Sequence, residues 1–328
     1  MELTIYALIF ATLSISSVIS QENVDATTSN RTKSVDDIYL RFYNGSTMDE
    51  FIEFPLPQCM RLFNVPGFRQ NNPTVFYVHG YTENPYRESI KTVVTAYLES
   101  KPNTNIILVD WSNMNERPYL TNGSVNTQPV GVALATNMNI LINNGLPLKN
   151  IHLIGHSLGG QVVGYTGRTL INSYGKTLKR ITGLDPAFPN FYPDGIFLKH
   201  IRDTDAEFVD IIHTDAGGYG APVPTGTVDF WPNGGRSVQP GCPVAFPLTD
   251  SSYCSHWRSW RFYAESVRNL TGFPAAPNDS YLKFRTSPPA TTGIVYMGYI
   301  TDPSSKGNYF LTTNSASPFA KGVDGLKP

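Results

Sequence analysis

The sequence has little cysteine, little net charge and no repeated unit. Its 328 residues include only three cysteines, Cys59, Cys242 and Cys254, which allow one disulfide and leave one thiol. A chain with so few cross-links depends on an apolar core, and 41% hydrophobic residues over this length supply one. The formal net charge is −1, which excludes binding to nucleic acid or an anionic surface through overall charge.

The first twenty residues also lack lysine and arginine, and their apolar run ends where a polar segment begins at Gln21. The small residues Val18 and Ser20 precede this boundary. The pattern predicts a secretory signal peptide over residues 1–20. Residues 21–34 contain almost no large apolar side chain and are expected to form a mobile tail. The folded domain is expected to occupy residues 35–328 of a secreted, extracellular protein.

Five Asn-x-Ser/Thr triplets agree with passage through a secretory pathway. Such triplets also arise by chance in a chain rich in asparagine and serine. The candidate acceptors for N-linked glycans are Asn30, Asn44, Asn122, Asn269 and Asn278.

Short apolar runs alternate with amphipathic segments along the chain. The runs are rich in β-branched residues and do not alternate with polar ones, as is typical of parallel strands buried on both faces. Between the second and third runs, a segment with Pro129 near its start and Gly145 as its stop predicts a crossover helix. This order predicts an α/β fold with a mostly parallel central sheet flanked by helices, whose ligands bind at the carboxyl ends of the strands. The expected strands are 74–80, 105–111, 150–157, 181–185 and 208–215.

A G-x-S-x-G pattern follows the third expected strand and precedes an expected helix. It reads Gly155-His156-Ser157-Leu158-Gly159. In this context the pattern is typical of a sharp turn that exposes a serine hydroxyl as nucleophile. A side chain at either flanking position would collide with neighbouring backbone, so both positions require glycine. Ser157 is therefore the candidate nucleophile.

A serine at its free pKa is a poor nucleophile, so the site needs a histidine as base and a carboxylate to orient that histidine. The chain order expected for this fold is serine, acid, histidine. Asp185 ends the strand that follows the serine and is the candidate acid. Asp110 precedes the serine, and two other carboxylates lie one strand further on. The alternatives are thus Asp110, Asp210 and Asp215.

Six histidines compete for the role of base. Only His256 lies beyond all the recognisable strands, so it is the candidate. His213 is the serious alternative, although it lies within the expected strand 208–215, where a buried, hydrogen-bonded histidine is the ordinary interpretation. His79 and His156 are expected to support the loops around the serine. His152 and His200 have no motif around them.

The oxyanion of a tetrahedral intermediate needs two backbone N–H donors, one from the residue after the nucleophile and one from an earlier strand-end loop. Leu158 follows the serine and supplies the first. Tyr81 follows the strand 74–80 and supplies the second, with Gly80 allowing a close approach of the backbone.

Five segments, in this order, make the chain resemble the pancreatic-lipase family over residues 35–328. They are GHSLGG, GLDPAFP, FVDIIHTDAG, DFWPNGG with QPGC, and CSHWRS. The resemblance is strongest to the insect members, which include phospholipases A1 and gut lipases. It implies an α/β-hydrolase fold and a secreted enzyme that cleaves lipid esters at a membrane or droplet interface. The implied residues are a triad of Ser157, Asp185 and His256, oxyanion donors Tyr81 and Leu158, and a lid closed by a disulfide between Cys242 and Cys254.

Two departures from the family pattern limit the expected partners. The chain ends before a C-terminal β-sandwich domain of the larger members could fit, so we expect a single catalytic domain and no colipase-like partner. Phe197 and Arg202 stand where the family's calcium loop has acids, although Asp205 remains. We therefore expect no calcium site and no other metal or cofactor.

Two short loops set the expectation for substrate. Only 11 residues separate Cys242 from Cys254, and only 13 separate Asp215 from Asp229. Short loops resemble the phospholipase A1 branch, in which the sn-1 acyl chain is released, and the apolar segment 243–248 is expected over the active-site mouth. A triacylglycerol lipase or galactolipase is the alternative within enzymes. A non-catalytic, lipid-binding relative of the insect yolk proteins is the alternative of another class, but those relatives lack the nucleophile that this chain keeps.

Overall fold

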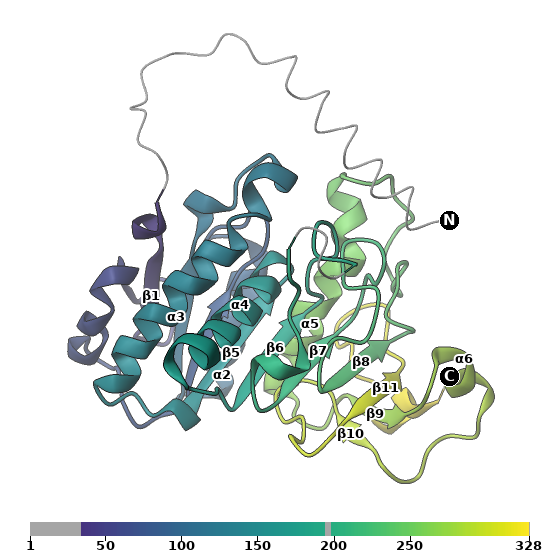
Figure 1. The fold of residues 1–328 in the computed structure, drawn as a ribbon. Coiled ribbons are helices and arrows are strands. Elements are labelled where there is room, and N and C mark those ends of the chain that lie inside the picture. Colours follow the sequence, from purple (N-terminus) through teal and green to yellow (C-terminus); the bar gives the residue numbers. More distant parts are fainter. Residues whose placement is uncertain (1–33, 194–197, 328) are drawn as a thin grey trace, which may run out of the picture.

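The computed structural model describes residues 34–193 and 198–327, and a mostly parallel sheet of 11 strands runs through its centre (Figure 1). Across the sheet the strand order is β10-β9-β11-β8-β7-β6-β5-β3-β4-β1-β2. The strands from β4 to β11 in this order pair in parallel, whereas the strands at both edges pair antiparallel. The strands are β1 (Tyr39–Tyr43), β2 (Phe51–Pro55), β3 (Thr74–Val78), β4 (Asn105–Asp110), β5 (Ile151–His156), β6 (Arg180–Leu184), β7 (Val209–Ile212), β8 (Val228–Pro232), β9 (Pro274–Pro277), β10 (Val295–Tyr296) and β11 (Gly307–Leu311).

The five strands expected from apolar runs are β3 to β7, and they lie side by side in the middle of the sheet. The predicted α/β fold with a mostly parallel sheet is confirmed. The strand ends differ from the expected ones by one to three residues, and the difference is largest at β7, which ends at Ile212 so that His213 follows the strand instead of lying inside it. Six of the 11 strands were not recognised in the sequence, and three of them, β9, β10 and β11, come after His256. They were missed because Pro-Ala-Ala-Pro, Val-Tyr and Gly-Asn-Tyr-Phe-Leu are too short or too poor in β-branched residues to read as buried strands.

Helices cover both faces of the sheet (Figure 1). One apolar core joins α3 and α4 to one face, and a second joins α2 and α5 to the other. The predicted crossover helix is α3, and Gly145, with φ +106°, follows its end. The α-helices are α2 (Glu88–Ser100), α3 (Thr127–Asn143), α4 (Leu158–Tyr174), α5 (Cys254–Arg268) and α6 (Tyr281–Thr286). The 3₁₀-helices are η1 (Val35–Asp37), η2 (Leu56–Asn64), η3 (Ser112–Met114), η5 (Leu148–Asn150), η6 (Asp203–Asp205), η7 (Asp250–Tyr253) and η8 (Gly322–Leu326), and η4 (Tyr119–Gly123) is a π-helix.

Some sequence-based expectations fall outside the described residues. These are the signal peptide over residues 1–20, residues 21–33 of the expected tail, the sequon at Asn30, and Phe197. Within 34–193 and 198–327, no helix is both long and apolar enough to span a bilayer.

Candidate active site

Ser157 occupies the turn between β5 and α4 with φ 54° and ψ −118°, a conformation that side chains rarely adopt. Its two flanking glycines are required by backbone contacts. A Cβ atom at Gly155 would lie 2.1 Å from the carbonyl oxygen of Gly159, and one at Gly159 would lie 2.1 Å from the carbonyl oxygen of Val78. The turn therefore locks β5, α4 and the end of β3 together, and it holds the serine at the carboxyl edge of the sheet.

Asp185 and His256 meet beside this turn, although their positions in the chain differ by 71. Asp185 directly follows β6, and its Oδ2 lies 2.6 Å from Nδ1 of His256 in the first turn of α5. The other carboxylate oxygen accepts the main-chain N–H groups of Thr214, at 2.9 Å, and Asp215, at 3.2 Å. Three hydrogen bonds thus fix a fully buried carboxylate, and that carboxylate fixes one face of the imidazole.

The alternative acids have other partners or a different place. Asp110 lies 3.3 Å from Nε2 of His79, and Asp210 forms a two-pronged ion pair with Arg180. Asp215 is buried next to Asp185 and accepts the Ser237 hydroxyl. Burial and the neighbouring Asp185 raise the pKa of Asp215 to about 6. None of the three hydrogen-bonds an imidazole beside Ser157 among the described contacts.

The alternative base, His213, is held elsewhere. Its Nε2 lies 2.7 Å from Oδ1 of Asp229, and its ring stacks on Trp231 at 3.7 Å between centroids. His213 is fully buried, and the residue after it supplies an N–H to Asp185. It therefore supports the loop beneath the candidate acid and does not face the serine.

Two main-chain N–H groups near Ser157 have no hydrogen-bond partner within the described part of the chain. They belong to Leu158, the first residue of α4, and to Tyr81, which follows the end of β3. A Cβ atom at Gly80 would lie only 3.0 Å from Cβ of Ser157, so the backbone before Tyr81 approaches the serine as closely as a glycine allows. Both N–H groups are thus available to an incoming oxygen atom.

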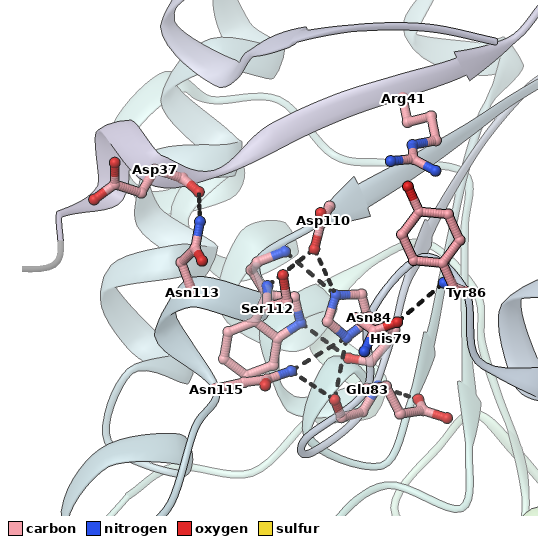
Figure 2. A network of polar contacts seen from close by, with 12 residues as sticks. Asp37, Arg41, His79, Glu83, Asn84, Tyr86, Asp110, Ser112, Asn113 and Asn115 are labelled. Carbon is pink, nitrogen blue, oxygen red and sulfur yellow. Dashed lines mark hydrogen bonds and ion pairs between the residues drawn. The ribbon is translucent and has the colours of Figure 1, made fainter. Parts of the chain in front are cut away.

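The loop after β3 is held by a polar network that sequence reasoning mostly missed. Figure 2 shows His79 between Asp110 and Asn115, with Glu83 on the neighbouring turn. Oε2 of Glu83 accepts the Gly80 N–H at 2.6 Å and lies 3.2 Å from Nδ1 of His156. Although burial opposes the charged form, His156 and the Ser89 hydroxyl lower the pKa of Glu83 to about 2. His79 lies in the loop after β3 and His156 ends β5 directly before the serine, next to the loops that they were expected to support, but no short motif marks Glu83 or Asn115.

Cys242 and Cys254 form a disulfide, which closes a short loop ending at α5. Tyr219 ties this loop to the site, because its hydroxyl accepts the Leu248 N–H at 2.7 Å and its ring lies 5.8 Å from that of His256. Within the loop, Val244 and Phe246 are 89% and 85% exposed. A cavity of about 220 Å³ lies under the loop and is lined by Asp215, Gly218, Tyr219, Ser237, Val238, Pro243, Val244, Ala245, Pro247, Ser252 and Ser255.

Asp205, the acid that remains at the position of the family's calcium loop, forms an ion pair with the side chain of Arg168. Both of its carboxylate oxygens accept from Arg168, at 3.0 and 2.9 Å, and the Arg202 N–H donates to Oδ2. Across the described residues, no group of three or more His, Cys, Asp or Glu side chains is arranged to hold a metal ion.

A parallel sheet, helices on both faces and a strained serine turn between β5 and α4 define an α/β hydrolase. The sequence model of the family described as Lipase matches residues 16–319. The chain belongs to this family, and within it to the group of the pancreatic lipases.

Three curated relatives illustrate the similarity. The chain is 33% identical to pancreatic triacylglycerol lipase of Sus scrofa, over 78% of this chain and 61% of the relative. It is 34% identical to inactive pancreatic lipase-related protein 1 of Homo sapiens, over 78% and 59%. It is 33% identical to pancreatic lipase-related protein 2 of Mus musculus, over 79% and 58%. The chain thus spans about three fifths of the length of these relatives.

Proposed function

We propose that this protein is a secreted lipid carboxylic-ester hydrolase with Ser157 as nucleophile, His256 as general base and acid, and Asp185 as the carboxylate that orients the histidine. The observation that carries the proposal is the 2.6 Å contact between Asp185 and His256 beside the strained serine turn. The contact leaves Nε2 of the imidazole for proton transfer, because Nδ1 is committed to the carboxylate.

The reaction has two halves. Ser157 Oγ attacks the acyl carbon while His256 takes the hydroxyl proton, and the carbonyl oxygen becomes an oxyanion bound by the N–H groups of Tyr81 and Leu158. The intermediate collapses, the ester C–O bond breaks, and His256 gives its proton to the leaving alcohol. Water then attacks the acyl-serine with His256 again as base, and it releases the fatty acid and the free serine. Asp185 stays ionised and stabilises the imidazolium in both halves.

The finer proposal is phospholipase A1 chemistry, in which the sn-1 acyl chain of a phospholipid is released. It rests on the short Cys242–Cys254 loop, which Tyr219 ties down at Leu248 and Ser252. So short a loop provides little wall for several acyl chains at once, and its exposed Val244 and Phe246 can enter a lipid surface. A bulky headgroup then stays near water.

Triacylglycerol hydrolysis is the second candidate, and galactolipid hydrolysis a third. The names of the curated relatives favour the former, because pancreatic triacylglycerol lipase of Sus scrofa is among them. A non-catalytic lipid-binding role is the candidate of another class, and the relative of Homo sapiens named as inactive shows that the family includes inactive members.

Serine and histidine variants test the proposed catalysis. Ser157→Ala and His256→Ala are each expected to lower turnover of a soluble ester by about 10⁶, because triad members act as a unit. His213→Ala is the matched control, and it is expected to cost stability while an organophosphate still labels Ser157. Retention of most activity in either triad variant would overturn the assignment.

Positional analysis of the released fatty acid tests the substrate. Phosphatidylcholine, galactolipid and long-chain triglyceride are offered in the same vesicles or emulsion, and kcat/KM is compared. Release from the sn-1 position of phospholipid with the highest kcat/KM supports the proposal. A much higher kcat/KM for triglyceride replaces it with the lipase alternative.

Secretion and glycosylation complete the proposal. The signal peptide over residues 1–20 and the domain over residues 35–328 remain inferences from the sequence. The four sequon asparagines within the described residues, Asn44, Asn122, Asn269 and Asn278, all reach the surface. Expression in a secreting cell, with and without a glycosidase, shows by mass whether the chain is exported, cut near Gln21 and glycosylated.

A further inference from the structure

We propose that Asn115 is a positioning residue for the oxyanion site, because its side-chain amide fixes the peptide unit whose N–H comes from Tyr81. This inference rests on the proposed function, since it assigns a task within the same reaction. Asn115 follows η3 in the segment after β4, and it belongs to none of the motifs that mark the serine, the acid or the base.

Asn115 reaches the loop after β3 from the neighbouring strand connection (Figure 2). Its Nδ2 donates to the carbonyl oxygen of Gly80 at 2.7 Å and lies 3.2 Å from Nδ1 of His79. Its own main-chain oxygen accepts the Thr82 N–H at 3.3 Å. The side chain is fully buried, and its Oδ1 has no partner among the described residues. The amide therefore acts in this network only as a donor.

The geometry of a peptide bond turns this contact into a constraint on Tyr81. The carbonyl of Gly80 and the N–H of Tyr81 belong to one peptide unit, which is trans. In a trans peptide these two groups point in opposite directions within one plane. A hydrogen bond that holds the Gly80 oxygen toward Asn115 therefore holds the Tyr81 N–H away from Asn115.

The other side of Gly80 is held as well. Its N–H donates to Glu83 at 2.6 Å, and a Cβ atom at this residue would press on Ser157 and His156 at 3.0 Å each. The Tyr81 ring packs edge-on against Tyr119 at 5.0 Å. The Gly80 oxygen also accepts the Glu83 N–H at 3.3 Å. With both polar groups of Gly80 committed, the Tyr81 N–H has no partner among the described residues, and its direction is set before substrate arrives. Such preorganisation stabilises the oxyanion without a reorganisation cost during the reaction.

His79 explains why the donor at residue 115 is an amide. Trp111 donates its indole N–H to the His79 carbonyl at 3.0 Å, and Asp110 lies 3.3 Å from Nε2 of the same histidine. Nε2 also lies 3.3 Å from the Trp111 main-chain nitrogen, and Nδ1 lies 3.1 Å from the Gly80 oxygen. In the tautomer that carries its proton on Nε2, toward Asp110, Nδ1 is an acceptor. One primary amide carries two N–H bonds, which suffice for Nδ1 of His79 and the oxygen of Gly80 together.

The test separates transition-state binding from ground-state binding. Asn115→Ala and Asn115→Leu both remove the donor, and Leu keeps most of the side-chain volume so that at least one folded variant is obtained. With a soluble short-chain ester, kcat per titrated active site is expected to fall about 10- to 100-fold while KM stays within about twofold. The inhibition constant of a trifluoromethyl ketone, which forms an oxyanion on adding Ser157, is expected to rise by the same factor as kcat/KM falls.

Asn105→Ala is the matched control. Asn105 is also buried, and its Nδ2 donates to the carbonyl oxygen of Arg69 at 2.8 Å, at the opposite ends of β3 and β4. Its loss is expected to lower stability but to leave kcat and the ketone's inhibition constant unchanged. If Asn115 variants behave like this control, the inference is wrong while the proposed function stands. If the unaltered protein shows no Ser157-dependent hydrolysis, the proposed function itself has failed.

Discussion

Oε2 of Glu83 lies 3.2 Å from Nδ1 of His156, and the contact ties the loop after β3 to the residue that precedes Ser157. The same carboxylate accepts the Ser89 hydroxyl and the Gly80 N–H. These contacts outweigh burial and hold the pKa of Glu83 at about 2 instead of its usual 4.5. A carboxyl group whose pKa is lowered in the folded state stabilises the fold above its unfolded pKa and loses that contribution as pH falls.

Glu83→Gln is therefore expected to lower the free energy of unfolding at pH 7 by up to about 3 kcal/mol. The difference from the unaltered protein is expected to shrink between about pH 4.5 and pH 2, where Glu83 of the unfolded state and then that of the folded state are protonated. Urea unfolding at several pH values measures it. A difference that does not change with pH would show that the charge of Glu83 has no part in the effect.

Gly159→Ala is expected to abolish folding or activity, because the added Cβ would lie 2.1 Å from the carbonyl oxygen of Val78 and two backbones cannot both yield. Gly175→Ala is the matched control at the other end of α4. Gly175 has φ +62° with no atom within 4 Å of the added Cβ, so only backbone strain of about 1 kcal/mol is expected. Thermal unfolding of both variants decides the point, and equal losses would contradict the contact argument.

The cysteines are expected to differ in accessibility. Cys242→Ser is expected to destabilise the protein by roughly 3 kcal/mol, since the disulfide closes a loop of sequence separation 12.

Cys59 is buried, and burial raises the pKa of its thiol. In the absence of reductant, Ellman's reagent is expected to detect no thiol in the folded protein and one thiol, that of Cys59, after denaturation. Peptide mapping that joins Cys59 to either of the other two would refute this.

Hydrolysis of a soluble ester is expected to survive excess calcium chelator, because Arg168 neutralises both oxygens of Asp205. Activity is measured before and after chelation, and again after calcium is restored. A loss that calcium reverses would show that a cation binds despite the guanidinium. Arg168→Gln is the informative companion, because it frees Asp205 and is expected to cost stability without creating calcium dependence.

The sequence was sufficient for the middle of the sheet and for the serine turn. The strands β3 to β7 are almost entirely buried, so most of their residues are apolar, and the steric need for Gly155 and Gly159 leaves a recognisable pattern around the serine. The meeting of Asp185 with His256 could be expected from chain order and family resemblance, but the 2.6 Å contact depends on where α5 packs.

The hydrogen bonds that hold the loop after β3 could not be predicted from the sequence, and the reason is physical. Asn115 acts through one side-chain hydrogen bond to a backbone oxygen 35 residues earlier, and such a bond imposes no periodicity on its neighbours. Glu83 likewise lies in a turn, where an acidic side chain is ordinarily exposed to solvent, so the sequence gives no sign that its carboxylate is hydrogen-bonded. The edge strands were missed because β9 and β10 are short segments, whose pairing is decided by β11 and by each other.

The place of β11 between β8 and β9 also constrains how the chain is made. A ribosome delivers β8, α5 and β9 before β11, yet β8 and β9 do not pair with each other. A nascent chain that has just released His256 therefore carries every residue of the proposed site but leaves one edge of β8 unpaired. The sheet beneath α5 can close only after residue 311 has left the exit tunnel, so synthesis of β11 is expected to set the time at which the proposed site is complete.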